Sequence, residues 1–389
     1  MPATGPGSTS LDLRVGDVVE VRSPEEIRAT LDENGELESL PFMPEMLKYC
    51  GRRMTVQKVA HKACDTLTRG GIRRMENAVH LTGARCDGAG HGGCQAACLI
   101  YWKNAWLRKV DPAEAPPPPA VTPDPAPLLP LLTIASRRPP DEDGAERYRC
   151  QATELLRAAP QQLRLRDLSQ FVQDVRTGNV GPWWSARAFL VALYNRLQDA
   201  GVRYLPRWLR IRGGRHWGYL RGTAGKTPTG HTDLRPGDLV RIKSRAQIEP
   251  TLNADLLNRG MGFDAEMARF CGRTTRVARR VDHIIDERTG KMLRMRHPCI
   301  VLEDVVCEGA YNASCPRAIT PYWRVTAPSV SSRIGIVTRF SLTQASTVDR
   351  LSSMLTAMTE SPFRDRSRCS RSTVEGNSLV QCGHQVAQK

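Results

Sequence analysis

The stretch PFMPEMLKYCGRR at residues 41–53 returns as GFDAEMARFCGRT at residues 262–274. Both stretches contain the motif F-x-x-E-M-x-x-[YF]-C-G-R, and they are separated by an offset of 221 residues. The same offset, without a gap, relates residues outside the motif: Asp12/Asp233, Gly16/Gly237, Cys86/Cys307, Cys94/Cys315 and Trp102/Trp323. The chain is therefore a tandem duplication, in which each copy is a unit that buries an apolar face. Two copies of one unit suggest a pseudo-dimer.

Each copy predicts the same order of secondary structure. In the first copy a Gly16-Asp17 turn precedes a strand of alternating apolar residues, and Ser23, Pro24 and Glu26 predict the capped start of a short helix. A second short helix and three strands follow, over residues 44–49, 54–62, 75–85 and 98–110. This order predicts an antiparallel, partly open barrel with a helical insert.

The turn and strand that open each copy resemble the start of SH3-like barrels, which occur in ribosomal, transcription and nitrile-hydratase-type proteins. The motif, together with RCDGAGHGGCQAACLIYWK at residues 85–103, resembles a group of uncharacterised bacterial tandem-repeat proteins. This second resemblance covers both copies and the segment between them, but not the C-terminal tail. With the predicted elements, it implies an α+β fold of two tandem SH3-like, mainly antiparallel β-barrel repeats with short helical inserts. It implies no activity, because such barrels serve unrelated functions.

Composition divides the chain into six segments. Proline density favours an extended linker after the first copy, and apolar periodicity over residues 148–200 predicts a helical hairpin. The predicted segments are a disordered start at 1–10, repeat 1 at 11–110, a Pro-rich linker at 111–145, a basic helical segment at 146–231, repeat 2 at 232–325 and a disordered tail at 326–389.

The bulk composition limits the class of protein. The 389 residues include 56 Lys and Arg against 40 Asp and Glu, a net charge of +16 that favours acidic or polyanionic partners. No apolar run reaches the roughly eighteen residues that a membrane span needs, and the N-terminus lacks the pattern of a secretory signal. We therefore expect a cytoplasmic protein without a membrane partner. Twelve cysteines then point to metal binding, redox chemistry or simple burial instead of a disulfide scaffold.

Arginine and tryptophan concentrate between the two copies. Residues 146–221 hold fourteen Arg and five acidic residues. Arginine can pair with phosphate, and exposed aromatic rings can stack on bases. The alternative interpretation is an amphipathic helix pair with buried tryptophans. The candidate polyanion-binding residues are Arg207, Arg210, Arg212, Arg215, Trp208 and Trp217.

Cysteine and histidine cluster in the first copy. Thiolate and imidazole are ligands that Zn²⁺ prefers, usually four in tetrahedral array, and the glycine-rich loop lets the chain fold tightly about an ion. We predict a zinc site in repeat 1 built from some four of Cys50, His61, Cys64, Cys86, His91, Cys94 and Cys98. Repeat 2 keeps the equivalents Cys271, Cys307 and Cys315. Buried free thiols, an iron–sulfur cluster and a disulfide from Cys86 to Cys94 or Cys98 are the alternatives.

The sequence predicts no catalytic residue, and it contains no G-x-S-x-G, P-loop or H-E-x-x-H motif. The leading hypothesis is a non-enzymatic, zinc-binding interaction or accessory protein, whose partner is an unknown protein or a polyanion. One alternative is a metal- or thiol-dependent enzyme, or a subunit of one. Another is a nucleic-acid-binding protein that uses the Arg/Trp-rich middle of the chain.

Overall fold

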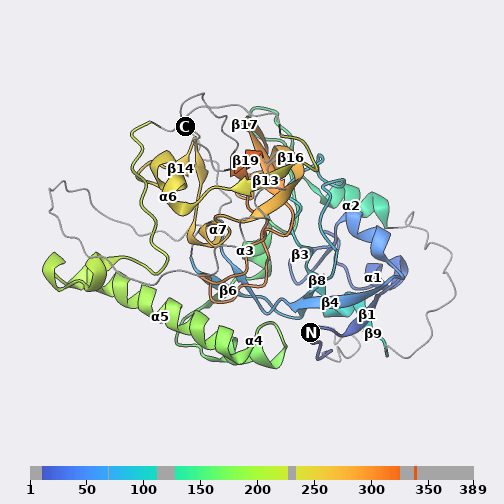
Figure 1. The fold of residues 1–389 in the computed structure, drawn as a ribbon. Helices are drawn as coiled ribbons and strands as arrows, with labels where there is room; N and C mark the ends of the chain where they lie inside the picture. The colour runs from blue at the N-terminus through green and yellow to red at the C-terminus, as the bar shows by residue number, and fades with distance from the viewer. Residues whose placement is uncertain (1–10, 69, 112–127, 227–233, 325–336, 340–389) are drawn as a thin grey trace, which may run out of the picture.

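The computed structural model of the chain describes residues 11–68, 70–111, 128–226, 234–324 and 337–339 (Figure 1). Its strands pair in antiparallel sheets and alternate with helices, so the predicted α+β class is confirmed. The two largest sheets have five strands each, and neither closes on itself within the described residues. The predicted SH3-like barrels are therefore not confirmed.

The five-stranded sheet of repeat 1 has the order β8-β7-β4-β1-β9. Its strands are β1 (Val18–Val21), β4 (Arg53–Val59), β7 (Ala78–Leu81), β8 (Trp102–Lys103) and β9 (Leu107–Lys109). The other elements are α1 (Pro24–Arg28), β2 (Glu36–Leu37), β3 (Leu40–Pro41), η1 (Pro44–Tyr49), β5 (Lys62–Cys64), β6 (Ile72–Arg74) and η2 (Asn104–Trp106). α1 begins at the predicted capping box, in which the Ser23 hydroxyl accepts a hydrogen bond from the Glu26 N–H. The predicted second helix is the 3₁₀ helix η1.

Repeat 2 has the same strand order, β18-β17-β16-β13-β19. Its strands are β13 (Leu239–Ile242), β16 (Thr274–Ile285), β17 (Met292–Leu302), β18 (Trp323–Arg324) and β19 (Val337–Arg339). Its other elements are α6 (Arg245–Ile248), η5 (Glu249–Thr251), β14 (Leu257–Asn258), β15 (Met261–Gly262) and α7 (Ala265–Ala268). β19 takes the edge position of β9, although it falls in the tail that we predict to be disordered. The rest of that tail, like residues 1–10, lies outside the described residues.

The recurring motif builds the core of each repeat. Phe42 lies edge-on to Trp102 with ring centroids 6.2 Å apart, and its equivalent Phe263 lies edge-on to Trp323 at 6.1 Å. All four side chains are buried, so each pair combines apolar burial with a favourable edge-to-face alignment. The second-last residue of the motif is a glycine with positive φ in both copies, a backbone conformation that other residues adopt only with strain.

The segment between the repeats departs from its predicted boundaries. The helix α2 (Leu129–Ala135) forms inside the predicted linker, and Leu132 is buried in the repeat-1 core. The following elements are β10 (Arg137–Arg138), β11 (Arg147–Tyr148), α3 (Leu155–Ala158) and β12 (Gln162–Leu163). β12 pairs with β6, so that Gln162 and Leu163 add a strand to a sheet of repeat 1. The predicted helical hairpin is shorter, and consists of α4 (Ser169–Arg176) and α5 (Pro182–Tyr204), with η3 (Arg207–Leu209) and η4 (Ile211–Gly214) beyond it.

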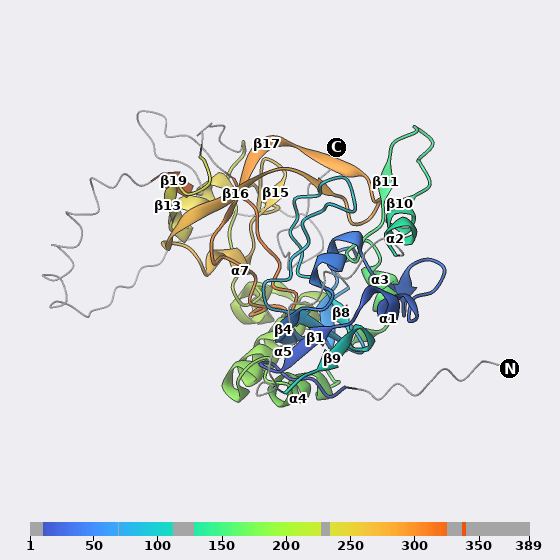
Figure 2. The ribbon, with the colours of Figure 1, turned by 90° about the vertical axis from the view of Figure 1, so that its right-hand side faces the viewer.

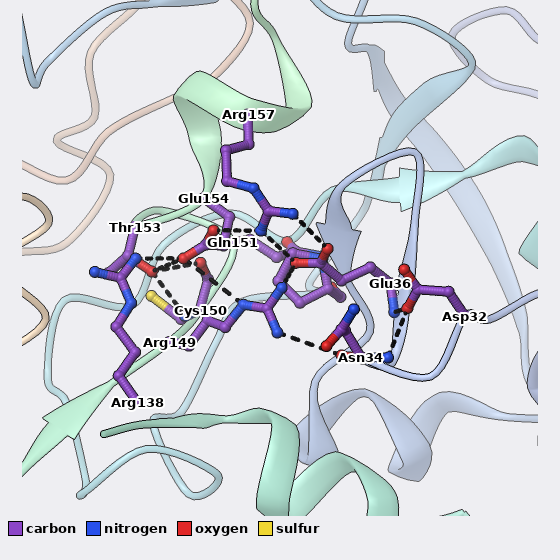
Figure 3. A network of polar contacts seen from close by, with 11 residues as sticks. Asp32, Asn34, Glu36, Arg138, Arg149, Cys150, Gln151, Thr153, Glu154 and Arg157 are labelled. Atoms are coloured by element: carbon purple, nitrogen blue, oxygen red, sulfur yellow. Dashed lines mark hydrogen bonds and ion pairs between the residues drawn. The ribbon is translucent and has the colours of Figure 1, made fainter. Parts of the chain in front are cut away.

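Ion pairs hold this extension against repeat 1 (Figure 3). The carboxylates of Glu36 and Glu154 are buried, and each contacts Arg149 and Arg157. Arg157 donates to both Glu36 oxygens at 3.0 Å and to Glu154 at 2.7 Å, and Arg138 also contacts Glu154. Buried carboxylates require such partners, since an unpaired buried charge is costly. The network ties residues 149–157 to Glu36 of repeat 1.

The two repeats pack on each other about a local pseudo-two-fold axis. The Cys64 N–H donates to the Cys315 sulfur at 3.0 Å, and the Ile285 N–H donates to the Cys94 sulfur at 3.3 Å. Cys64 and Ile285 are equivalent positions of the two repeats, as are Cys94 and Cys315. The two hydrogen bonds are therefore equivalent, one donated by each repeat to the other. This symmetry supports the pseudo-dimer that the duplication suggests.

Residues near this axis pair with their own equivalents. The Thr66 hydroxyl donates to Glu287 at 2.6 Å, and Arg288 donates to the Leu67 carbonyl at 3.0 Å; each contact joins positions 221 residues apart. The hairpin of β16 and β17 reaches from repeat 2 towards β11, where the Tyr148 N–H donates to the Gly290 carbonyl at 2.8 Å (Figure 2). The repeats and the extension thus form one packed body.

The buried His80 predicts an acid-sensitive fold. Its Nδ1 lies 2.8 Å from the Ile100 carbonyl, and burial lowers the pKa of this imidazole from 6.5 to about 4. Between these values the unfolded chain binds a proton that the folded chain does not, so the free energy of unfolding should decrease by up to roughly 3 kcal/mol as the pH falls. Urea unfolding between pH 7 and pH 4 should show a shallower pH dependence in His80→Phe than in the wild type, and identical slopes would contradict this assignment.

Candidate metal centre

A glycine-rich loop, residues 86–98, carries most of the predicted metal ligands. The Cys86 N–H donates to the Cys98 carbonyl at 2.9 Å and closes the loop at its base. Inside it, the His91 N–H donates to the Gly88 carbonyl at 3.0 Å. A Cβ on Gly88 would lie 2.3 Å from a backbone oxygen across the loop, so a residue with a side chain would force the loop apart.

The loop places Cys86 and His91 beside Glu45 of η1. Cys86 Sγ lies 3.2 Å from Glu45 Oε1 and 3.5 Å from His91 Nε2, and His91 Nδ1 lies 3.3 Å from Glu45 Oε1. One ligand atom from each of the three residues lies within 4.8 Å of the other two. Gly90 leaves room for this arrangement, because a Cβ there would lie 2.6 Å from Glu45 Oε2.

The polar atoms at this site are incompletely satisfied. Glu45 Oε2, His91 Nδ1 and the Tyr101 hydroxyl are buried and make no hydrogen bond within the described part of the chain. Buried polar atoms nearly always have a partner, which indicates that an ion, a water or a ligand belongs here. Since carboxylate, thiolate and imidazole all bind Zn²⁺, the Glu45, Cys86 and His91 group could hold a metal ion.

Burial sets the protonation of these ligands in the metal-free protein. Burial, followed by the Glu45 carboxylate, raises the pKa of the Cys86 thiol, and burial lowers the pKa of His91. Both shifts favour neutral side chains. A bound cation reverses this preference for the thiol, because a metal deprotonates a coordinating cysteine.

The three residues open on a cavity of about 420 Å³ between the repeats. Cys94, Cys98 and Tyr101 line it from repeat 1, while residues 284–289 and Arg317 line it from repeat 2. The Arg317 guanidinium is buried, and donates to the Cys64 carbonyl at 2.9 Å and to the Thr66 hydroxyl at 3.0 Å. The volume suits a small molecule, and the lining mixes apolar walls with a few polar groups, as ligand sites do.

The structure brings together four of the seven predicted ligands at this cavity: Cys86, His91, Cys94 and Cys98. The other three lie elsewhere. Cys50 is buried in the repeat-1 core, and His61 lies 3.2 Å from Asp174 of α4. Cys64 packs with Cys307, Cys315 and Ile319 in a separate buried cluster.

Sequence reasoning missed two residues of the site. Glu45 is the glutamate of the recurring motif, and Cys150, which lines the same cavity, lies beyond the proline-rich stretch. One sequence signal could have identified Cys150: Cys150-Gln151-Ala152 repeats the Cys94-Gln95-Ala96 of the loop. Gln151 fixes that position, since its side chain accepts from the Tyr101 N–H and donates to the Tyr101 and Pro41 carbonyls at 2.9 to 3.1 Å.

Repeat 2 has no equivalent of this group within the described residues. Glu266 occupies the position of Glu45, but its Oε1 accepts the Tyr311 N–H at 2.7 Å, and Asn312 replaces the histidine. Cys307 belongs to the cluster with Cys64, and Cys271 packs against the repeat-2 core. The three shared cysteines therefore serve packing in repeat 2.

The predicted polyanion-binding residues divide into two sets. Arg210 caps the end of α5, because its guanidinium donates to the carbonyls of Val202 and Leu205 at 2.9 Å. The other five are exposed: Arg207, Arg212, Arg215, Trp208 and Trp217. The prediction of buried tryptophans does not hold for Trp208, which is 81% exposed.

The cysteines of the metal-free protein should be poor nucleophiles. Burial raises the pKa of Cys50 and Cys98 to about 12 and that of Cys271 to about 11, so that little thiolate forms at neutral pH. Treatment of the chelated, folded chain with iodoacetamide at neutral pH should label these thiols more slowly than it labels the urea-unfolded chain, as peptide mass spectrometry would show. Rapid labelling of one native cysteine would indicate an activated thiol and would favour the thiol-enzyme alternative.

No described helix is long and apolar enough to cross a membrane. Comparison with known proteins adds no relative: no protein-family model, no curated protein and no solved structure matches the chain.

Proposed function

We propose that the chain is a zinc-binding protein without catalytic activity of its own, and that it acts as an accessory or interaction protein. The observation that carries the proposal is the convergence of Glu45, Cys86 and His91 at the inter-repeat cavity, with buried polar atoms that lack hydrogen bonds. Zinc suits this set better than calcium or magnesium, which prefer oxygen ligands alone.

A structural zinc site requires a fourth protein ligand. Cys98 and Cys150 line the same cavity as Cys86, and a thiolate on either one would raise the pKa of Cys86. We infer that one of these thiols completes the site. Zinc bound in this way would join η1 to the glycine-rich loop, and also to the extension if Cys150 is the fourth ligand, and would stabilise the surface that repeat 1 presents to a partner.

A zinc-dependent enzyme is the second candidate, because only three ligands converge and a cavity adjoins them. In that case the fourth position holds water or substrate, as in catalytic zinc sites. The zinc content of Cys98→Ala and Cys150→Ala distinguishes the two. Loss of zinc in either variant supports the structural site, whereas zinc that is retained in both variants and lost in Cys86→Ala supports an open site.

Metal content should depend on repeat 1 and not on repeat 2. The purified full chain should contain about one zinc per molecule by elemental mass spectrometry, and Cys86→Ala and His91→Asn should lose it, because even changes around the ligands weaken zinc sites by about ten- to a hundredfold. His91→Asn places in repeat 1 the residue that repeat 2 carries at the equivalent position, so the substitution is compatible with the fold of the loop.

Matched controls come from the second copy. Cys307→Ala and Glu266→Gln alter the equivalents of Cys86 and Glu45 and should retain zinc. Zinc should also raise the melting temperature of the wild type and of these controls, but not that of the ligand variants. The reason is that an ion that binds the folded chain and not the unfolded chain stabilises the folded state. Equal zinc in all variants, or none in the wild type after zinc is supplied, would refute the site.

A further inference from the structure

A second concave surface lies between the middle segment and repeat 2, and it shares no lining residue with the cavity at the metal centre. It is an open groove of about 860 Å³, lined by three arginines and three aromatic residues: Arg212, Arg215, Arg245, Trp217, Tyr219 and Tyr311. No acidic side chain lines it among the described residues. We infer that this groove binds single-stranded nucleic acid, a function that goes beyond the proposed metal site.

The groove arises from the divergence of the two copies. Tyr311 occupies the position of Gly90, so the loop that holds the metal ligands in repeat 1 supplies an aromatic wall in repeat 2. The segment around Gly218 packs closely against the Tyr311 ring. A Cβ on Gly218 would lie 2.8 Å from this ring and 2.9 Å from Ala265. Pro44, the equivalent of Ala265, contacts Gly90 in repeat 1, where no ring could be accommodated.

Two arginines in the groove are held over aromatic rings. The Arg215 guanidinium lies 4.6 Å from the centre of the Tyr219 ring, and that of Arg212 lies 5.9 Å from the Trp217 ring. Stacking of this kind orients a guanidinium and leaves its N–H edge available for phosphate. Neither arginine forms an ion pair within the described part of the chain, and both are exposed.

Two acidic groups near the groove, Glu249 and Asp199, each have a hydrogen-bond partner. Glu249 accepts from Arg245 at 2.8 Å, which reduces the charge that Arg245 offers, and Asp199 lies 2.7 Å from His216. The net positive charge of the groove therefore rests mainly on Arg212 and Arg215. The adjoining η3 adds Arg207 and the exposed ring of Trp208, so basic and aromatic residues continue past the groove.

This combination favours a single strand over other anions. A carboxylate polymer would use the arginines but would gain nothing from half-exposed Trp217 and Tyr219, which are 46% and 42% exposed. In a duplex the base faces are stacked on one another and cannot reach such rings, whereas a single strand offers phosphates and free base faces together.

The test uses the full-length protein and fluorescein-labelled oligo(dT), with binding followed by anisotropy between about 50 and 200 mM salt. Each phosphate contact with a single strand contributes about 0.7 to the slope of log K against log salt. Arg212→Gln/Arg215→Gln should therefore lower this slope by about 1.4 and weaken binding at least tenfold at low salt. The control Arg164→Gln/Arg166→Gln removes the same charge from two exposed arginines outside the groove and should leave the slope unchanged.

Three further probes test the identity of the ligand. An abasic strand of equal charge, a duplex and polyglutamate should each compete more weakly than unlabelled oligo(dT). Equal competition by the abasic strand or by polyglutamate would overturn the inference, since the surface would then recognise charge alone, and stronger binding of the duplex would do the same. Equal slopes for the groove and control variants would also contradict it. The groove variants leave the metal ligands unchanged, so they should retain zinc. A loss of nucleic-acid binding with normal zinc content therefore concerns the groove alone, and not the proposed metal function.

Discussion

The packing of the two repeats on each other is the contact on which the rest of the structure depends. Each repeat donates a backbone N–H to a cysteine sulfur of the other, from Cys64 to Cys315 and from Ile285 to Cys94. Sulfur is a weak acceptor, so these bonds add little energy by themselves. Their importance is geometric: they fix the register in which the glycine-rich loop of one copy faces the hairpin of the other, and this register forms the cavity.

Duplication followed by divergence explains why the two equivalent loops differ. In repeat 1, Gly90 leaves room for the Glu45 side chain, and three ligand types converge. In repeat 2, the Tyr311 N–H donates to one oxygen of the equivalent Glu266, Arg269 lies 3.6 Å from the other oxygen, and the tyrosine ring faces a different surface. Two neighbouring differences, Tyr311 in place of Gly90 and Asn312 in place of His91, thus distinguish the candidate metal loop of repeat 1 from the wall of the basic groove in repeat 2. A duplicated fold permits this change, because the copy that keeps its original residues continues to serve the first role.

The sequence predicts the architecture better than the site. Constant spacing reveals the duplication, and the turn and capping signals locate β1 and α1, because these depend on local chemistry. Cys86 and His91 lie side by side because they are five residues apart in one loop. Glu45 and Cys150 reach the site through tertiary packing, which no spacing in the chain reveals. The prolines of the linker likewise conceal that α2 and residues 147–163 return to the repeat-1 core.

X-ray absorption at the zinc edge of the purified full chain tests the central claim most directly. The account predicts a mixed shell, with one or two sulfur ligands at about 2.3 Å and at least two nitrogen or oxygen ligands at about 2.0–2.2 Å. A shell of four sulfurs would contradict it, since the ion would then lie among cysteines without Glu45 and His91. A shell without sulfur would contradict it equally, because Cys86 would not be a ligand.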